Sequence, residues 1–347
     1  MRNKIIMLVL SVALAVSLAA VGCAEPEAAK PTVLRMVDHS VAESVRGDAL
    51  NIFKESVEEL TNGRVQIELY FAESLLEEAE FLAGTKEGTC DMCVVAPGKH
   101  IAELPHWAVL ETCPYGPDLV QQIDFYWNLL DEIPELVEDY TNLNQKIFAF
   151  SHTPVLAIYT SKPCDTIWDL AGSSIRCYAQ PHAVMMEVLG ALPVSMPTAE
   201  AFTAMQRGTI DGTLTTFEAG YRFRFHEAVE GVTILYLSDM SPNSSNPFSI
   251  NIDSFNKLSE ADQKVIMVCG EEMTIYIANG IAEQVAVMRQ EMIDIGCTIV
   301  DVPSEDQAQW RDDPRVDALP DEWAKKMGGN ATEIVDKLRV LLAEATK

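Results

Sequence analysis

One arginine stands in a segment that is otherwise predicted to be a buried strand. Residues Ser174–Tyr178 form a short, mostly apolar segment with Arg176 at its centre. A guanidinium inside such a strand is costly unless an anionic group meets it. That group is either a glutamate of this chain or a ligand. Arg176 is therefore the first candidate for binding an anionic ligand.

Sequence motifs of enzymes and metal sites give little support to catalysis. The chain contains no GxGxxG, GxxxxGK[ST] or GxSxG segment. Ser254–Lys257 matches SxxK, but the companion motifs of penicillin-recognising enzymes are missing from the sequence. His100 and His106 flank Glu103 without an HExxH motif. We therefore expect no catalytic residues, no metal and no cofactor, and an enzyme acting on a small acid remains the less favoured alternative.

The charge balance and the cysteines restrict the possible partners further. The net charge of −27 makes nucleic acid a poor partner and repels anions at long range, so an anionic ligand needs a local cation. Cys90 and Cys93 have CxxC spacing, but no second CxxC completes a zinc site. They fall in a predicted buried strand, and we expect the thiols to be free and to pack as small apolar residues.

The N-terminus has the pattern of an export signal. Arg2 and Lys4 precede an apolar run, and the segment Ala20–Cys23 resembles a bacterial lipobox. We expect residues 1–22 to be a signal peptide, Cys23 to carry lipid, and residues 23–31 to be a flexible tether. An uncleaved transmembrane anchor is the alternative, although the run is short for one. The remaining 325 of 347 residues suffice for two domains.

Apolar periodicity predicts an α/β fold. A strand at Val33–Val37, a helix at Glu43–Leu60 and a strand at Arg64–Tyr70 form a βαβ unit, which indicates a parallel sheet. A helical pattern then runs from Ser259 to about Ile295, with glycines as possible bends. A helix of that length is unusual within one compact domain.

The order of short motifs around Arg176 resembles the extracytoplasmic solute receptors of tripartite ATP-independent periplasmic (TRAP) transporters. The spacing of these motifs together, more than any one of them, carries the resemblance, which covers nearly all of the mature chain. The matching segments are Thr61-Asn62-Gly63-Arg64-Val65, Gly88-Thr89-x-Asp91-Met92, Trp168-Asp169-Leu170-x-Gly172, Ile175-Arg176, Gly190-Ala191-x-Pro193-Val194 and Ala204-x-Gln206-x-Gly208-x-Ile210-Asp211-Gly212, followed by Glu227.

The resemblance implies a two-lobed periplasmic-binding-protein fold with a ligand cleft between the lobes and a long helix that spans both. Lobe I would comprise residues 32–152 and 241–280, and lobe II residues 153–240 and 281–347. The implied function is capture of a small organic acid outside the cytoplasm and its delivery to the membrane subunits of a TRAP transporter. We expect a monomeric, membrane-anchored lipoprotein. A solute-sensing receptor that works with a sensor protein is the alternative within this fold.

The resemblance also implies particular ligand contacts. Arg176 would bind the carboxylate, as in the family. Thr215 stands where the family often has a supporting asparagine, Thr216 and Phe217 follow it, and His39 ends the first strand at a ligand-facing position. Tyr178 shares a face with Arg176 by the period-two alternation of strands. Ordinary core packing is an equally good interpretation of Phe217 and Tyr178.

Departures from the sialic-acid-binding branch indicate the kind of acid. That branch has a second arginine on the strand before Trp168, where this chain has Leu156 and Ala157, and a pocket glutamate where it has Ala96. A sugar acid therefore fits poorly. With Phe217 near the expected carboxylate, we expect a ligand with one carboxylate and an apolar remainder, such as an aromatic or branched-chain acid.

Overall fold

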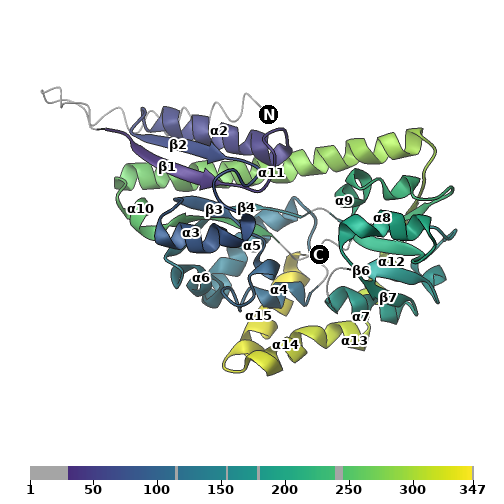
Figure 1. Ribbon diagram of the computed structural model, residues 1–347. Coiled ribbons are helices and arrows are strands. Elements are labelled where there is room, and N and C mark those ends of the chain that lie inside the picture. The colour runs from purple at the N-terminus through teal and green to yellow at the C-terminus, as the bar shows by residue number, and fades with distance from the viewer. Residues whose placement is uncertain (1–29, 114–115, 154, 178–179, 239–244, 346–347) are drawn as a thin grey trace, which may run out of the picture.

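A computed structural model describes residues 30–113, 116–153, 155–177, 180–238 and 245–345 (Figure 1). The expected signal peptide, the lipidation residue Cys23 and the candidate ligand contact Tyr178 lie outside these residues. The described chain folds into two α/β lobes joined by a long helix, α11 (Glu260–Asp294), which passes along both of them (Figure 1). The predicted two-lobed architecture and lobe-spanning helix are confirmed.

The first lobe is built on a five-stranded sheet. Strand β1 pairs in parallel with β2 and β3, as the predicted βαβ unit requires, whereas β10 runs antiparallel between β3 and β4. The strands lie in the order β2 (Val65–Tyr70), β1 (Thr32–Val37), β3 (Met92–Val94), β10 (Asn246–Asn251) and β4 (Gln145–Ser151).

The second lobe is built on a six-stranded sheet. Its centre is β5, which runs antiparallel to both of its neighbours, while β6, β7 and β8 are mutually parallel. The strands lie in the order β11 (Thr298–Asp301), β9 (Thr233–Leu237), β5 (Leu156–Thr160), β8 (Gly212–Thr216), β6 (Ser174–Cys177) and β7 (Leu192–Ser195).

Helices cover both faces of the first sheet and form two cores. On one face, α2 and the first half of α11 bury an apolar cluster that includes Phe53 and Phe148. Ser44 caps α2 by accepting a hydrogen bond from the backbone of Gly47, and the chain leaves the helix through Gly63 at a φ of 74°. The helices of this lobe are α2 (Val45–Leu60), α3 (Phe81–Glu87), α4 (Ala108–Glu111), α5 (Gln121–Glu132), α6 (Pro134–Thr141) and α10 (Ile252–Asn256).

The second sheet is covered in the same way. The second half of α11 joins a core that contains Tyr159 and Phe217, while Trp310 and Met185 belong to the core on the opposite face. The helices of this lobe are α7 (Gln180–Val188), α8 (Thr198–Gln206), α9 (Phe217–Arg222), α12 (Ser304–Arg311) and α13 (Pro314–Asp317).

Helix α11 is rich in apolar residues because it contributes side chains to the cores of both lobes. By length and composition alone it could cross a membrane, yet its buried residues lie in the cores of the two lobes, Ile277 in the first and Val285 in the second. Its glycines allow close packing: a Cβ on Gly270 would lie 2.2 Å from the carbonyl oxygen of Phe148. No bend has to be invoked for Gly270.

The C-terminal helices require one correction to the predicted lobes. We assigned residues 281–347 to lobe II, but α14 (Leu319–Met327) leads back across the molecule, and α15 (Ala331–Ala345) packs against α5 (Figure 1). Leu338 and Leu342 of α15 belong to a core of the first lobe. The amphipathic pattern of this helix was readable in the sequence, but the partner for its apolar face was not.

Candidate functional site

The strand that carries Arg176 ends at the edge of the second sheet that faces the first lobe. Strands β6 and β8 are parallel, with Arg176 opposite Thr213, and β8 pairs antiparallel with β5 so that Thr216 lies opposite Leu156. The chain enters β5 directly from β4 of the first lobe. The ends of β6 and β8 therefore lie beside this connection, between the lobes.

The Arg176 side chain is buried and held by oxygens that carry no charge. The residue is 2% exposed. Its Nε donates a hydrogen bond to the carbonyl oxygen of Met196 at 3.0 Å, and its Nη2 donates to Oγ1 of Thr198 at 2.7 Å. Neither of these two oxygens carries a charge, and both help to orient the guanidinium. A buried cation is stabilised by a nearby anion.

The pKa of His182 is affected by the positive charge of Arg176. The ring is 2% exposed, and its pKa is lowered to about 4, first by burial and then by the charge of Arg176. The imidazole is therefore neutral at pH 7, and Arg176 supplies the positive charge at this place. His182 was not among the residues that we predicted. It follows Arg176 by six positions, but only the fold brings the two side chains together.

The three consecutive residues predicted near the carboxylate have different environments. Thr215 is 5% exposed, and Thr216 is half-buried and caps α9 by accepting a hydrogen bond from the backbone of Ala219 at 3.2 Å. The Phe217 ring is fully buried and meets the Tyr236 ring edge-on at 5.2 Å. Phe217 therefore packs in the core of the second lobe, and its contact with a ligand stays a prediction.

His39 belongs to a charged cluster at the end of β1 in the first lobe. Arg46 donates to the buried carboxylate of Asp38 at 2.9 Å and lies 2.7 Å from Nε2 of His39. Lys99 pairs with Glu78 at 2.6 Å. Burial, and next to it the charge of Arg46, lowers the pKa of His39. Sequence reasoning found only His39, although a run of polar residues directly after an apolar strand was a usable signal for the others.

The loose histidine cluster that was considered as a metal site has a structural role. Nδ1 of His106 lies 2.7 Å from a carboxylate oxygen of Asp139, while His100 is buried separately. Among the residues that the structure describes, no group of three or more potential ligands could hold a metal ion. The contact with Asp139 thus explains the position of His106.

The cysteines lie in the cores, as expected. Six of the seven described cysteines are buried, and all seven are free thiols. Burial raises the pKa of Cys93 to about 12, and its sulfur lies 3.4 Å from Oγ of Ser249. A thiol that stays protonated is a poor nucleophile and a poor metal ligand. The CxxC spacing at Cys90 and Cys93 therefore serves packing.

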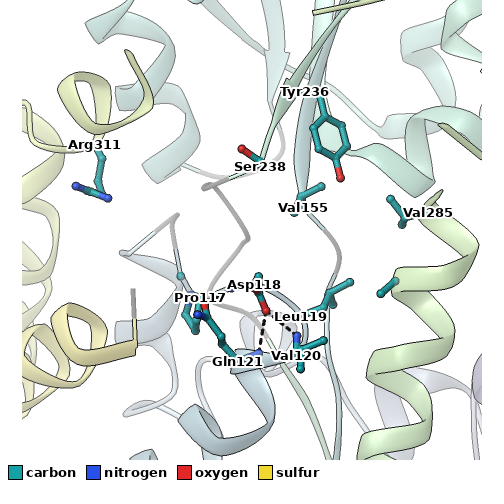
Figure 2. A pocket seen from close by; sticks show the side chains of 12 residues that line it. Pro117, Asp118, Leu119, Val120, Gln121, Val155, Tyr236, Ser238, Val285 and Arg311 are labelled. Atoms are coloured by element: carbon teal, nitrogen blue, oxygen red, sulfur yellow. Dashed lines mark hydrogen bonds between the residues drawn. The ribbon is translucent and has the colours of Figure 1, made fainter. Parts of the chain in front are cut away.

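A cavity of about 570 Å³ lies at the junction of the lobes, beside the connecting strands (Figure 2). Its wall comes from the first lobe on one side, from the second lobe on the other, and from α11. None of the predicted ligand contacts lines it, but the backbone of Phe217 donates a hydrogen bond to the carbonyl oxygen of Val155 at 2.9 Å. The lining residues are Gly116, Pro117, Asp118, Leu119, Val120, Gln121, Val155, Tyr236, Ser238, Ala282, Val285 and Arg311.

The cavity and Arg176 are separate parts of the region between the lobes. Val155 and Tyr236 lie at β5 and β9, whereas Arg176 lies on β6, beyond the intervening strand β8. Neighbouring strands are about 4.8 Å apart, so roughly 10 Å separates β5 from β6. We give Arg176 more weight than the volume of the cavity, because Arg176 is buried, whereas the charged residues of the cavity wall, Asp118 and Arg311, are exposed or half-buried.

Comparison with protein families and curated proteins gives a consistent result. The model of the bacterial extracellular solute-binding proteins, family 7, matches residues 37–326. A solute-binding protein of Roseobacter denitrificans is 27% identical over 254 residues, which are 72% of this chain and 75% of that protein. The C4-dicarboxylate-binding periplasmic protein DctP of Rhodobacter capsulatus is 23% identical over 334 residues, 89% of this chain and 92% of that protein.

Solved structures share the fold over almost the whole described chain. A TRAP periplasmic solute-binding protein of Desulfovibrio salexigens, solved as an open complex, has a TM-score of 0.78 at 21% identity and covers 91% of this chain and 97% of its own. A marine metagenome TRAP solute-binding protein with bound 3-hydroxybenzoate has a TM-score of 0.71 at 22% identity, with coverage of 92% and 100%. A Bordetella pertussis extracytoplasmic solute receptor binding pyroglutamic acid has a TM-score of 0.67 at 19% identity, with coverage of 89% and 99%.

Proposed function

The chain belongs to family 7 of the bacterial extracellular solute-binding proteins, and we propose that it captures a small organic acid through Arg176 and delivers it to the membrane subunits of a TRAP transporter. Proteins of this family are receptors for solutes outside the cytoplasm, and an enzymatic activity is not part of the proposal. Cys23 would anchor the monomeric receptor to the membrane by a lipid.

The observation that carries the proposal is the buried guanidinium of Arg176 on β6, at the edge of the second sheet that faces the first lobe. Met196 and Thr198 accept hydrogen bonds from it and help to orient it. A protein with a net charge of −27 repels anions at long range, so an anionic ligand needs a local positive group such as Arg176. A carboxylate that enters this site exchanges water for charge-assisted hydrogen bonds in a medium of low polarity, where they are stronger.

The ligands of related proteins support an acid as the ligand of this chain. The ligands named for relatives include a C4-dicarboxylate, 2,3-diketo-L-gulonate, 3-hydroxybenzoate, pyroglutamic acid and glucuronate. These molecules differ in size and polarity but share a carboxylate. The group they share is the group that Arg176 is suited to bind, so the remainder of the molecule decides specificity.

We propose that the described conformation is open and that the lobes close on the ligand by a hinge at the β4–β5 connection. The Desulfovibrio salexigens protein, solved as an open complex, has a TM-score of 0.78 to this chain. The protein with bound 3-hydroxybenzoate and the receptor binding pyroglutamic acid have lower TM-scores, 0.71 and 0.67. Closure around a solute is the usual motion of two-lobed receptors. The lobes would be residues 32–152 with 241–280, and residues 153–240 with 281–318, the C-terminal helices belonging to the first lobe.

For the ligand itself we propose one carboxylate and a mostly apolar remainder. Leu156 is fully buried where the sialic-acid branch has an arginine-bearing strand, and Ala96 offers no charge. A second carboxylate left unpaired in a closed cleft costs roughly 1–3 kcal/mol. An apolar tail instead gains about 25 cal/mol for each Å² removed from water. Together these terms favour a monocarboxylate by about tenfold or more.

A titration of four acids tests the proposal. 3-Hydroxybenzoate, 2-oxoisovalerate, pyroglutamate and succinate are compared by thermal shift and by calorimetry, with 3-hydroxybenzamide as the uncharged control. We expect at least one acid to raise the melting temperature, because a ligand of the folded state stabilises it by linkage. Tightest binding to succinate would refute the predicted apolar remainder. Equal binding of 3-hydroxybenzoate and its amide would refute the carboxylate contact.

A further inference from the structure

We propose that Glu111 is a specificity-determining residue of the binding site: its carboxylate accepts a hydrogen bond from a hydroxyl or N–H group of the bound acid and repels a second carboxylate. The inference rests on the proposed function and narrows the ligand to a monocarboxylate whose mostly apolar remainder carries one hydrogen-bond donor. Glu111 is the last residue of α4.

Glu111 lies on the side of the first lobe that is turned toward the second. Figure 1 shows α4 at this side, opposite β6 and α7 of the second lobe. The Glu111 side chain packs against Gly98 in the η2 turn (Pro97–Lys99), which follows β3: a Cβ on Gly98 would lie 2.7 Å from Oε1 of Glu111. Because β1 and β3 are parallel, their carboxyl ends share one edge of the sheet. Ligands of open α/β sheets bind outside such an edge.

Tyr126 places Glu111 near the connection between the lobes. Burial, and next to it the negative charge of Glu111, raises the pKa of Tyr126, so the carboxylate lies near this ring. The Tyr126 ring stacks on the ring of His152 with 5.5 Å between the centroids. His152 directly follows β4, from which the chain crosses to the second lobe. Closure of the lobes would therefore bring Glu111 toward a ligand held on the second lobe.

The Glu111 carboxylate has no hydrogen bond or ion pair with another side chain within the described part of the chain. Burial raises its pKa, and no donor or positive charge offsets this effect. The residue is half-buried and not sealed in a core. A carboxylate that is largely withdrawn from water without a partner costs free energy, and a donor supplied by a ligand would offset this cost.

The chemistry of a carboxylate decides which ligands it favours. When ionised it accepts hydrogen bonds and donates none, so it favours a hydroxyl or an N–H group. It disfavours a second carboxylate, because like charges repel. Among the four acids of the titration, 3-hydroxybenzoate and pyroglutamate carry such a donor, whereas 2-oxoisovalerate and succinate do not.

Two pairs of acids isolate the donor. 3-Hydroxybenzoate is compared with benzoate, and pyroglutamate with cyclopentanecarboxylate, by calorimetry on the full-length protein. At least one donor-bearing acid should bind about tenfold or more tightly than its counterpart, as expected for a hydrogen bond to a charged group. Isophthalate, which has a second carboxylate in place of the hydroxyl of 3-hydroxybenzoate, should bind more weakly than benzoate.

Glu111→Gln keeps the shape of the side chain and removes its charge. This variant should bind isophthalate about tenfold more tightly than the unmodified protein does, because the repulsion is gone and an amide N–H can donate to a carboxylate. The advantage of 3-hydroxybenzoate over benzoate should shrink. Glu132→Gln is the matched control: it removes the same charge from an exposed site at the end of α5 and should change neither result. A residue with a purely structural role would not produce a gain of dicarboxylate binding.

Thermal melting without ligand makes the test independent of which acid binds. A carboxyl group whose pKa is raised in the folded chain destabilises that chain at pH 7, where it is ionised, so Glu111→Gln should raise the melting temperature. A lower melting temperature would show that the carboxylate stabilises the folded protein and would overturn the proposal. Unchanged selectivity in Glu111→Gln, or binding confined to acids without a donor, would also overturn it.

Failure of the proposed function has a different signature. If no acid binds, or if Arg176→Lys leaves acid binding intact, the proposed function itself fails, and the role of Glu111 with it. If acids bind through Arg176 but show no preference for a donor, only the role of Glu111 is refuted.

Discussion

Replacing Arg176 with lysine is the sharpest perturbation of the proposed receptor. The substitution retains a positive charge but removes the planar fork, and it shortens the reach of the side chain. In the structure, Nε donates to Met196 at 3.0 Å and Nη2 to Thr198 at 2.7 Å. One ammonium cannot reproduce both bonds and a two-point contact with a carboxylate at the same time. Ligand binding should therefore suffer more than folding.

The size of the effect follows from the burial of the site. The arginine is 2% exposed, so its contact with a carboxylate is made away from water. A hydrogen bond to a charged group contributes about 1.5–3 kcal/mol under such conditions. Loss of one of the two bonds to the carboxylate thus lowers affinity by about 10- to 150-fold. Arg176→Met should abolish acid binding, because it removes both the charge and the donors that would meet a carboxylate.

Calorimetry with the tightest-binding acid gives the affinity, and thermal melting of the ligand-free protein gives the stability. Arg207→Lys is the matched control, since this arginine is exposed at the end of α8 and the same change there should have no effect. An Arg176→Lys protein that is folded and binds with unchanged affinity would refute the reasoning. A large loss of stability in the ligand-free Arg176→Met protein would show instead that the arginine is paired for structural reasons.

Three further results are expected. Cys23→Ser should release the protein from the membrane fraction of a bacterial host, and retention with an uncleaved signal would identify a transmembrane anchor. In the native protein at pH 8, a thiol reagent should modify at most one of the seven described cysteines quickly. Burial raises the pKa of each of these thiols, and among them only Cys297 is not fully buried. After unfolding, all seven should react. Burial lowers the pKa of His152 from 6.5 to about 3, so below pH 6.5 the unfolded chain binds a proton that the folded chain does not. Stability should therefore fall between pH 6.5 and 3 by roughly 3–5 kcal/mol, and less in His152→Phe, which keeps an aromatic ring against Tyr126; an unchanged pH profile in this variant would contradict the assignment.

Local features of the sequence determined most of the secondary structure. The βαβ start, the cap at Ser44 and the left-handed turn at Gly63 are all encoded within a few neighbouring residues. The start of α11 after Ser259 was equally readable, because a serine cap and an apolar period need no information from elsewhere in the chain. Arg176 could be selected for the same reason, since a lone cation within an apolar strand is conspicuous in the sequence.

What only the tertiary structure decided is which groups meet. The carbonyl of Met196 and the hydroxyl of Thr198 reach Arg176 because β7 lies beside β6 in the sheet, a pairing that periodicity does not specify. The return of α15 to the first lobe had no local signal either, because an apolar helix face shows that it needs a partner but not which one. Residues distant in sequence become neighbours through sheet order and chain crossings. Arg176 could therefore be selected as a candidate from the sequence, but its contacts with Met196 and Thr198 could not be foreseen.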